Sequence, residues 1–479
     1  MAADSADKGE KAKWMVLVVI LVKVIMDGLD GSMLSIALPT ISRSLGVSST
    51  AIIWVVSSYS LTSATTVLFF GRLGDMIGKT RFYMIGIAIY IVSIVFSGMA
   101  NSLGMLVAAR VIQAIGAGCT MANGQGIIAM TFPEHQRGRA LGIYGGALSL
   151  GSLAGPTLSG YIVANMSWQY IFWLKAPFGV LAFLLGLKFF PKDAPARKET
   201  MDYPGALLYA MAIVPLVYSL QEGYSRGYTS VIILSGLAVS FVSFAAFFTM
   251  QRHKEMPLLD LGIFKNPVYS VSIIAVFIMS FSNAFRSIIT PFYMQGVLGT
   301  PPDVAGLYMS VAPVIVVLIT PVSGFLSDRV GSEKVAIIGQ SINFVGLLLM
   351  STLTARSSAI MLVIFICINS IGSSLFQPPN NTLIMSNLPP EKLGIGGSMN
   401  FAIQNLSAPL GVAFTTAVLY GGMSSDLGYR VEGYVRDSGM DEAFMYGMRN
   451  TCLIASVFCA FGVALSIWRI VLVNRRKTK

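Results

Sequence analysis

The sequence predicts an all-α polytopic membrane protein, and three observations support this prediction. Hydrophobic residues make up 54% of the 479 residues, and charged residues make up only 11%, less than half of the roughly 25% found in soluble proteins. The mean hydropathy is +0.71. Apolar stretches of about 20 residues, the length that crosses the hydrocarbon of a bilayer, recur along the whole chain. This composition excludes a soluble enzyme, a secreted disulfide scaffold and a disordered chain.

Polar breaks divide the apolar stretches into fourteen predicted transmembrane helices. They cover residues 14–38, 50–70, 82–99, 103–123, 138–163, 168–189, 203–221, 230–250, 268–293, 303–325, 335–354, 358–386, 394–421 and 446–473. We predict short tails at 1–13 and 474–479. The longest external segment, 422–445, is acidic and glycine-containing, and we interpret it as a solvated loop, with a short hairpin or helix as the alternative.

The basic residues fix the predicted orientation. The formal net charge is +11, and most Lys and Arg lie in alternate loops, so the positive-inside rule places both termini in the cytoplasm. We therefore attribute the basic charge to membrane orientation and expect no nucleic-acid partner. The N-terminal tail has no small-residue cleavage site, so the first apolar stretch is predicted to be a retained span and not a signal peptide.

Cysteine and histidine give no indication of a metal, a cofactor or an enzyme. The four Cys lie inside apolar stretches without metal-like spacing, and the two His lie in polar loops. An enzyme would need a nucleophile–base set or metal ligands. A sensor would need a soluble output domain, and no loop is long enough to form one. We therefore expect neither a metal ion nor a cofactor, and no enzymatic activity.

A glycine-rich cytoplasmic loop follows the second predicted helix. It contains Gly71, Asp75, Gly78, Lys79 and Arg81. The glycines permit a tight turn and close helix approach, and we expect the carboxylate to accept hydrogen bonds from the start of the next helix. The Gly-Lys-Thr ending also resembles a phosphate-binding loop. However, the spacing is one residue short and the loop lies between two spans, so we expect no nucleotide.

A weaker copy of this loop follows the tenth predicted helix. It reads Gly-Phe-Leu-Ser-Asp-Arg-Val-Gly, with Asp328 and Gly331 at the positions of the earlier Asp and Gly. Parallel repeats of this kind are common in transporters.

Four segments together resemble the motifs of the major facilitator superfamily. The loop described above resembles the superfamily's signature. The other three resemble the first-helix motif of the fourteen-helix drug:proton antiporter branch, the fourth-helix motif, with Ala114 where glycine is usual, and the fifth-helix motif of the antiporters. Their principal residues are Asp30; Arg110 and Gln113; and Gly151, Gly155 and Pro156.

This resemblance implies a major facilitator fold with 14 transmembrane helices that works by alternating access in a bacterial cytoplasmic membrane. The two loop copies are eight predicted helices apart, whereas two consecutive six-helix bundles would place them six apart. We therefore predict an N-terminal bundle at 14–189, two additional helices at 190–250 and a C-terminal bundle at 251–473. The additional pair is expected to link the bundles and to pack at the periphery.

Ionisable residues inside predicted spans are expensive and are candidates for functional sites. There are six: Lys23, Asp27, Asp30, Arg110, Lys175 and Arg286. The first three share one helix face, because they are spaced four and three residues apart. The resemblance implicates Arg110 in proton coupling. We expect Asp30 to exchange the proton and Arg110 to set its proton affinity, and we add Asp27 to the proton-coupling residues. Lys175 stands where the family pattern usually has Asn.

Several of these residues have a structural alternative. Lys23 and Asp27 are also explained by a neutralised structural pair, and Arg110 by an interhelical contact. Arg286 lies near a helix end, from which its side chain could reach water.

Four intramembrane cations against two carboxylates, and a thirteenth helix with amides but no acid, favour an anionic or zwitterionic amphiphile as the substrate. The predicted substrate-contacting residues are Lys23, Gln113, Lys175, Arg286, Gln377, Asn400 and Gln404. We predict efflux by proton antiport. The alternative is a proton symporter that imports an organic acid such as a bile-acid-like carboxylate. The expected partners are the small molecule, protons and the lipid bilayer, and we expect a monomer.

Overall fold

The computed structural model describes residues 2–191, 193, 202–254, 261–389, 393–431, 433–434 and 439–477. All regular secondary structure in these ranges is helical. Each of the fourteen predicted stretches is mainly helical, and two of them, 50–70 and 168–189, are each divided between two helices. The chain divides into two compact units. Unit 1 comprises residues 1–47, 54–201 and 302–310, and unit 2 comprises 48–53, 202–301 and 311–479.

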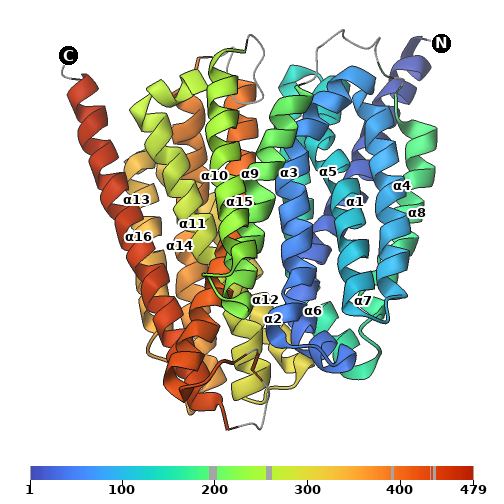
Figure 1. The fold of residues 1–479 in the computed structure, drawn as a ribbon. Helices are drawn as coiled ribbons and strands as arrows, with labels where there is room; N and C mark the ends of the chain where they lie inside the picture. Colours follow the sequence, from blue (N-terminus) through green and yellow to red (C-terminus); the bar gives the residue numbers. More distant parts are fainter. Residues whose placement is uncertain are drawn as a thin grey trace. The chain divides into compact units, whose positions relative to one another are not determined.

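Unit 1 is a helical bundle in which α1 packs against α6, and α5 packs against both α3 and α4 (Figure 1). Its helices are α1 (Ala2–Leu45), α3 (Trp54–Ile77), α4 (Lys79–Gly98), α5 (Leu103–Thr131), α6 (Glu134–Asn165), α7 (Tyr170–Trp173) and α8 (Ala176–Phe189).

Glycines bring α1 and α6 into backbone contact. A Cβ added at Gly28 would lie 2.4 Å from the Leu148 carbonyl oxygen, and one added at Gly151 would lie 2.3 Å from the Ile25 carbonyl oxygen. At Gly155 an added Cβ would overlap the Ser32 hydroxyl. These contacts are the close helix approach that small residues permit. They hold the middle of α1 against the bundle.

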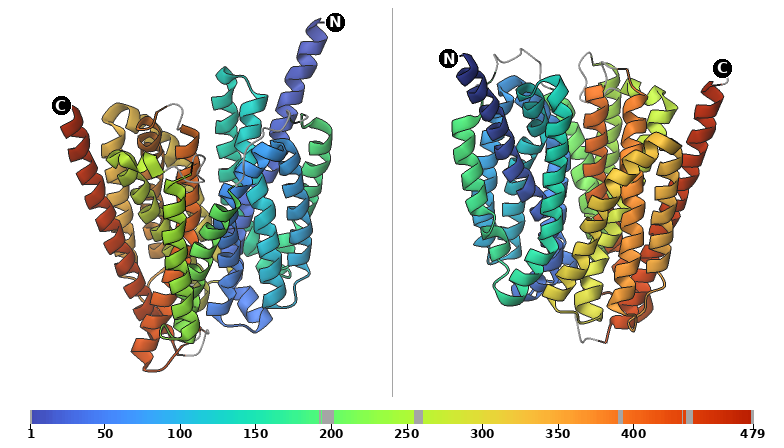
Figure 2. Two further views of the ribbon diagram at one scale, coloured as in Figure 1. Left: turned by 45° about the horizontal axis from the view of Figure 1, so that its top comes forward. Right: turned by 180° about the vertical axis from the view of Figure 1, so that it is seen from behind.

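Unit 2 contains the remaining helices, in which α13 packs against both α14 and α16, and α11 packs against α15 and α16 (Figures 1 and 2). Its elements are α2 (Ser49–Ile52), α9 (Tyr203–Arg226), α10 (Val231–Arg252), η1 (Leu261–Lys265), α11 (Pro267–Phe292), η2 (Tyr293–Val297), α12 (Pro302–Val330, shared with unit 1), α13 (Ser332–Met350), α14 (Ala359–Ser386), α15 (Leu393–Leu427) and α16 (Asp441–Lys477).

Length and hydropathy identify twelve membrane-spanning helices among the described residues, or thirteen when the bent α2–α3 segment is counted as one span. Helix α1 has 44 residues and is long enough to cross a bilayer, but it is not among the helices identified in this way. It carries three charged residues, Lys23, Asp27 and Asp30, within two turns of one another. The structure therefore shows a polytopic helical membrane protein. Fourteen spans, with α1 included, remain a prediction.

The two additional helices, α9 and α10, form a pair within unit 2, and α9 also packs against α15. Asp202 joins the start of α9 to the end of α10, on the side that the predicted orientation places in the cytoplasm. Its carboxylate accepts hydrogen bonds from the Gly205 amide and from Gln251 Nε2, both at 2.8 Å, and pairs with Lys254. Burial alone would raise the pKa of Asp202. The hydrogen bonds from Lys254, Gln251 and Gly205 outweigh it and hold this pKa below its usual value of 3.8.

The predicted external loop at 422–445 is shorter and better anchored than a solvated loop. Helix α15 continues to Leu427 and α16 begins at Asp441. Between them, the Val431 carbonyl accepts a hydrogen bond of 2.9 Å from the Tyr224 hydroxyl, and the Tyr434 carbonyl accepts one of 2.9 Å from Ser49 Oγ. Residues 428–430 are exposed, but the solvated-loop interpretation is wrong for 422–427 and 441–445, which are helical, and for Val431 and Tyr434, which are buried. Hydrogen bonds from distant segments replace solvent there.

Candidate functional site

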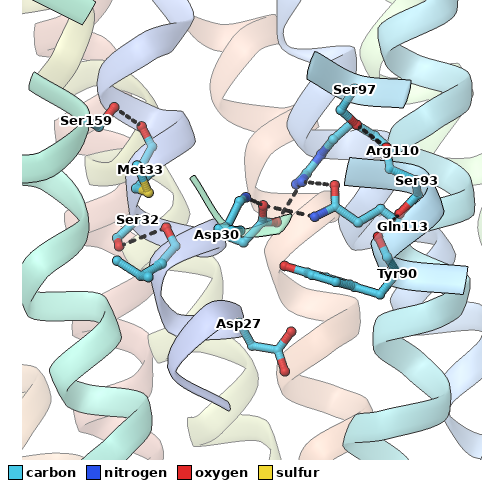
Figure 3. A network of polar contacts seen from close by, with 12 residues as sticks. Asp27, Asp30, Ser32, Met33, Tyr90, Ser93, Ser97, Arg110, Gln113 and Ser159 are labelled. Atoms are coloured by element: carbon cyan, nitrogen blue, oxygen red, sulfur yellow. Dashed lines mark hydrogen bonds and ion pairs between the residues drawn. The ribbon is translucent and has the colours of Figure 1, made fainter. Parts of the chain in front are cut away.

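A buried carboxylate on α1, that of Asp30, is the centre of the polar network of unit 1 (Figure 3). Arg110 Nη1 on α5 donates to Asp30 Oδ2 at 2.6 Å and to Gln113 Oε1 at 2.8 Å. Gln113 Nε2 in turn donates to Asp30 Oδ1 at 3.0 Å. The Arg110 Nε donates to the Val55 carbonyl at 3.2 Å, and its guanidinium lies 4.2 Å from the centre of the Tyr59 ring. Both edges of the guanidinium are thus held in place.

Lys175 completes this network from a break between two helices. Pro177 stands in the first turn of α8, where its missing N–H costs nothing, and Lys175 is the residue that precedes α8. Its side chain is 2% exposed and forms an ion pair with Asp30. Lys175 and Gln113, both predicted to contact the substrate, are therefore brought to the predicted proton-coupling carboxylate.

The second carboxylate on α1 has its own partner. Lys23 Nζ donates to Asp27 Oδ1 at 2.5 Å, and the same ammonium lies 4.0 Å from the centre of the Tyr90 ring. This geometry is that of the neutralised pair considered above.

In total, the network of unit 1 contains Lys23, Asp27, Asp30, Arg110 and Lys175, with one more cation than carboxylates. Such a network is costly to leave half-paired. No group of three or more His, Cys, Asp or Glu that could hold a metal ion occurs in the part of the chain that the structure describes.

Unit 2 contains a ladder of amide side chains between α14 and α15. Gln377 Nε2 donates to Gln404 Oε1 at 3.2 Å, and Gln404 Nε2 donates to Asn400 Oδ1 at 3.2 Å. Asn400 Nδ2 then donates to Asn381 Oδ1 at 3.0 Å. Three of the predicted substrate-contacting residues are therefore neighbours. Sequence reasoning missed Asn381, although its position four residues after Gln377 places it on the same face of α14.

Arg286 on α11 is half-buried, and its Nε has no hydrogen-bond partner in the described part of the chain. No ion pair joins it to a described carboxylate. It is therefore a cation available to a ligand in unit 2.

Arg469 on α16 is an intramembrane cation that sequence reasoning missed. It is not among the six intramembrane ionisable residues named above, but its side chain is completely buried. It lies within the predicted helix at 446–473, and this position was the signal that could have identified it. Its Nη1 donates to Ser272 Oγ and to Asn380 Oδ1, both at 2.8 Å.

The predicted loop after the second helix is confirmed as a glycine turn, but its carboxylate acts differently from the prediction. Gly78 has φ +112° and precedes α4, a conformation that favours glycine. Asp75 pairs with Lys79 and does not cap α4. Instead, Asp193 accepts hydrogen bonds of 2.8 Å from the amides of Thr80 and Arg81. An N-terminal cap from a distant segment could not be predicted from local spacing.

The second loop repeats this backbone geometry. Gly331 has φ +99° and precedes α13, and its amide donates to the Ser327 carbonyl at 3.0 Å, as the Gly78 amide donates to the Gly74 carbonyl at 3.0 Å. Asp328 is exposed at the end of α12. Gly71 does not serve close approach, because a Cβ added there would meet no described atom within 4 Å.

Close approach in the fifth-helix motif extends to α12. The Pro156 carbonyl oxygen would lie 2.3 Å from a Cβ added at Gly306, and the Pro302 carbonyl oxygen would lie 2.4 Å from one added at Gly160. The motif therefore serves tight backbone packing on two sides of α6.

A polytopic helical bundle with a repeated cytoplasmic-type loop and a buried ionic network defines a membrane transport protein. The model of the Major Facilitator Superfamily matches residues 20–282 and 271–479. The chain therefore belongs to this superfamily, whose members are secondary transporters and not enzymes.

Three relatives illustrate the range within the family. The riboflavin transporter RibZ of Clostridioides difficile is 34% identical over 463 residues, covering 96% of this chain and 98% of that protein. The multidrug resistance protein Stp of Mycobacterium tuberculosis is 31% identical, covering 85% of this chain and 76% of that protein. The lincomycin resistance protein LmrB of Listeria monocytogenes is 27% identical, covering 92% and 96%.

Solved structures show the same fold. A bacterial homologue of the human lysosomal transporter Spinster, in an inward-facing and unoccupied conformation, has a TM-score of 0.67 at 16% identity and covers 96% of this chain and 97% of its own. The nucleoside transporter NupG has a TM-score of 0.64 at 12% identity, with coverage of 96% and 99%.

Proposed function

We propose that this protein is a proton-coupled antiporter that exports an amphiphilic organic molecule. The observation that carries the proposal is the buried Asp30 carboxylate between two cations, Arg110 and Lys175. The drug-resistance names of Stp and LmrB support export. We further propose fourteen spans including α1, a location in the bacterial cytoplasmic membrane and cytoplasmic termini.

Asp30 is the proton-exchanging group in this proposal. When Asp30 takes up a proton, the network changes from one excess cation to two, and Arg110 and Lys175 lose their shared counter-ion. The resulting repulsion favours a conformation in which these cations move apart or meet another anion. Proton binding and conformation are thereby linked. Asp27, which pairs with Lys23 alone, is the second group that could take part.

Arg286 is the cation that we assign to the substrate, because Lys175 is already paired with Asp30. The amide ladder of Gln377, Gln404 and Asn400 supplies further hydrogen-bonding groups. Counting Arg469, cations exceed carboxylates in the described intramembrane segments by five to two, which favours an anionic or zwitterionic cargo.

The proposal is tested with purified protein in liposomes under an imposed pH gradient. A radiolabelled lipophilic carboxylate serves as the cargo, and native protein is compared with the Arg286→Gln and Arg226→Gln variants. Arg226 is a matched control, because it is half-exposed at the end of α9 and pairs with Glu222. We expect the carboxylate to move against the proton flow and Arg286→Gln alone to weaken its transport. Movement with the protons would instead show import, and preferential transport of a lipophilic cation would refute the assigned charge.

A second candidate function is transport of riboflavin or a similarly planar, polar heterocycle. The name of RibZ supports it, since that relative matches 96% of this chain. An uncharged heterocycle would use the amide ladder more than Arg286. Riboflavin added to the same liposomes distinguishes the candidates: its uptake should fall with Gln404→Leu and remain unchanged with Arg286→Gln.

A further inference from the structure

The guanidinium of Arg469 has one nitrogen that is hydrogen-bonded and two that have no described partner. Its Nη1 is occupied by Ser272 on α11 and Asn380 on α14. Its Nε and Nη2 are buried and have no hydrogen-bond partner in the described part of the chain. These two nitrogens lie on the same edge of the planar guanidinium. Their N–H bonds point in parallel, which is the arrangement that binds both oxygens of one carboxylate.

The neighbouring side chains fix the orientation of this edge. Asn380 Nδ2 donates to the Ser272 carbonyl at 3.0 Å, so the two residues that hold Nη1 are themselves tied together. One turn away on α16, Ser466 Oγ donates to Gln340 Oε1 at 2.8 Å. The Gln340 Nε2 is another buried donor without a described partner. That nitrogen lies against Gly462, two turns before Arg469 on α16. The unused donors of the site are therefore Nε and Nη2 of Arg469 itself, and no described carboxylate forms an ion pair with them.

A buried cation without a counter-charge is strongly unfavourable in a protein interior. The edge should therefore have an anionic partner during part of the protein's working cycle. We propose that the Nε–Nη2 edge of Arg469 is a binding site for a carboxylate inside unit 2, separate from the Asp30 network. It is independent of the proposed export direction and of the proton-coupling step.

A carboxylate could reach the edge from two sources. One is a small organic acid from solution. The other is Glu333, which stands half-buried in the first turn of α13 and interacts electrostatically with Arg469. Helix α13 packs against α16, and the Gln340–Ser466 contact places Glu333 about two turns from that contact, on the side toward which Arg469 also lies.

The test measures the thermal midpoint of unfolding of the full-length protein in detergent, with sodium benzoate or with neutral benzamide at matched ionic strength. The Arg286→Gln protein, which lacks the cation assigned above to the substrate, is compared with three derivatives: Arg469→Lys, which keeps the charge but lacks the parallel N–H pair, Glu333→Gln, and Arg226→Gln as the control. Arg469→Lys is preferred to Arg469→Gln because it keeps the charge and so guards against failure to fold.

Two outcomes support the proposal and separate the sources. If benzoate, but not benzamide, raises the midpoint of the Arg286→Gln protein and of its Glu333→Gln and Arg226→Gln derivatives equally, and not that of its Arg469→Lys derivative, the site takes a free carboxylate. If benzoate stabilises only Glu333→Gln, and this variant and Arg469→Lys lower the midpoint non-additively, Glu333 occupies the edge. The proposal is overturned if benzoate has no specific effect and the two variants add, or if its effect survives Arg469→Lys or disappears with Arg226→Gln.

Discussion

Replacing Asp30 by asparagine tests the ionic network most severely, because this one carboxylate is shared by two cations. Asparagine has nearly the same shape, so the substitution changes charge and little else. In native protein, Arg110 approaches Asp30 at 2.6 Å and Lys175 pairs with the other carboxylate oxygen. In Asp30→Asn both cations stay buried without a counter-ion.

The expected loss is large. Removing one partner of a buried ion pair costs about 3–5 kcal/mol, and we expect the free energy of unfolding to fall by this amount. Removing Lys175 as well leaves a single unpaired cation. The double variant Asp30→Asn/Lys175→Gln should therefore be more stable than the sum of the two single changes predicts, by about 0.5–3 kcal/mol.

The assay is denaturant unfolding of the purified protein in detergent micelles, followed by intrinsic fluorescence. Asp426→Asn is the matched control, because this carboxylate is exposed at the end of α15 and its change should stay within about 0.5 kcal/mol. If Asp30→Asn costs no more than Asp426→Asn, or if the Asp30 and Lys175 changes add without coupling, the network described here does not hold unit 1 together.

Three further predictions concern packing and capping. Asp193→Ala removes two hydrogen bonds at the start of α4, so it should lower the free energy of unfolding by about 0.5–2 kcal/mol and speed amide exchange there. Asp75→Ala should lower it by less than about 0.5 kcal/mol, because it breaks only an exposed pair. Equal effects would contradict the assignment of Asp193 as the cap. Gly151→Ala should lower the free energy of unfolding by about 1–3 kcal/mol, while Gly145→Ala, with open space around its Cα, should be neutral or stabilising in the same assay. Asp202→Asn should lower the thermal midpoint at neutral pH. Because folding lowers the pKa of Asp202, the stabilisation by its carboxylate is lost as the pH falls below 3.8. The difference in thermal midpoint between native protein and Asp202→Asn should therefore shrink there. A difference that stays constant would argue against a stabilising ion pair between Asp202 and Lys254.

The helices were largely predictable from the sequence, because apolar stretches of bilayer length leave few alternatives. The repeated turns were predictable as well, since Gly78 and Gly331 recur in matching local patterns. Local spacing also showed that Lys23, Asp27 and Asp30 share a helix face. These features depend only on residues close together in the chain.

Pairings between distant segments were not predictable. Lys175 is a recognisable departure from the family pattern, but only the fold brings it to Asp30, 145 residues away. The cap that Asp193 provides to α4 has the same origin. Arg469 was missed for a different reason. Its position near a helix end made a cytoplasmic location the simplest interpretation, whereas its side chain is buried and donates to Ser272 on α11 and to Asn380 on α14.

Proton coupling by Asp30 is best tested by comparing two kinds of transport. One is counterflow, and the other is transport driven by a pH gradient. Liposomes with native protein or Asp30→Asn are assayed for exchange of labelled carboxylate without a pH gradient, and then for accumulation driven by one. We expect Asp30→Asn to retain exchange, which needs no net proton movement, and to lose accumulation. Accumulation by Asp30→Asn at the native level, with exchange intact, would contradict it.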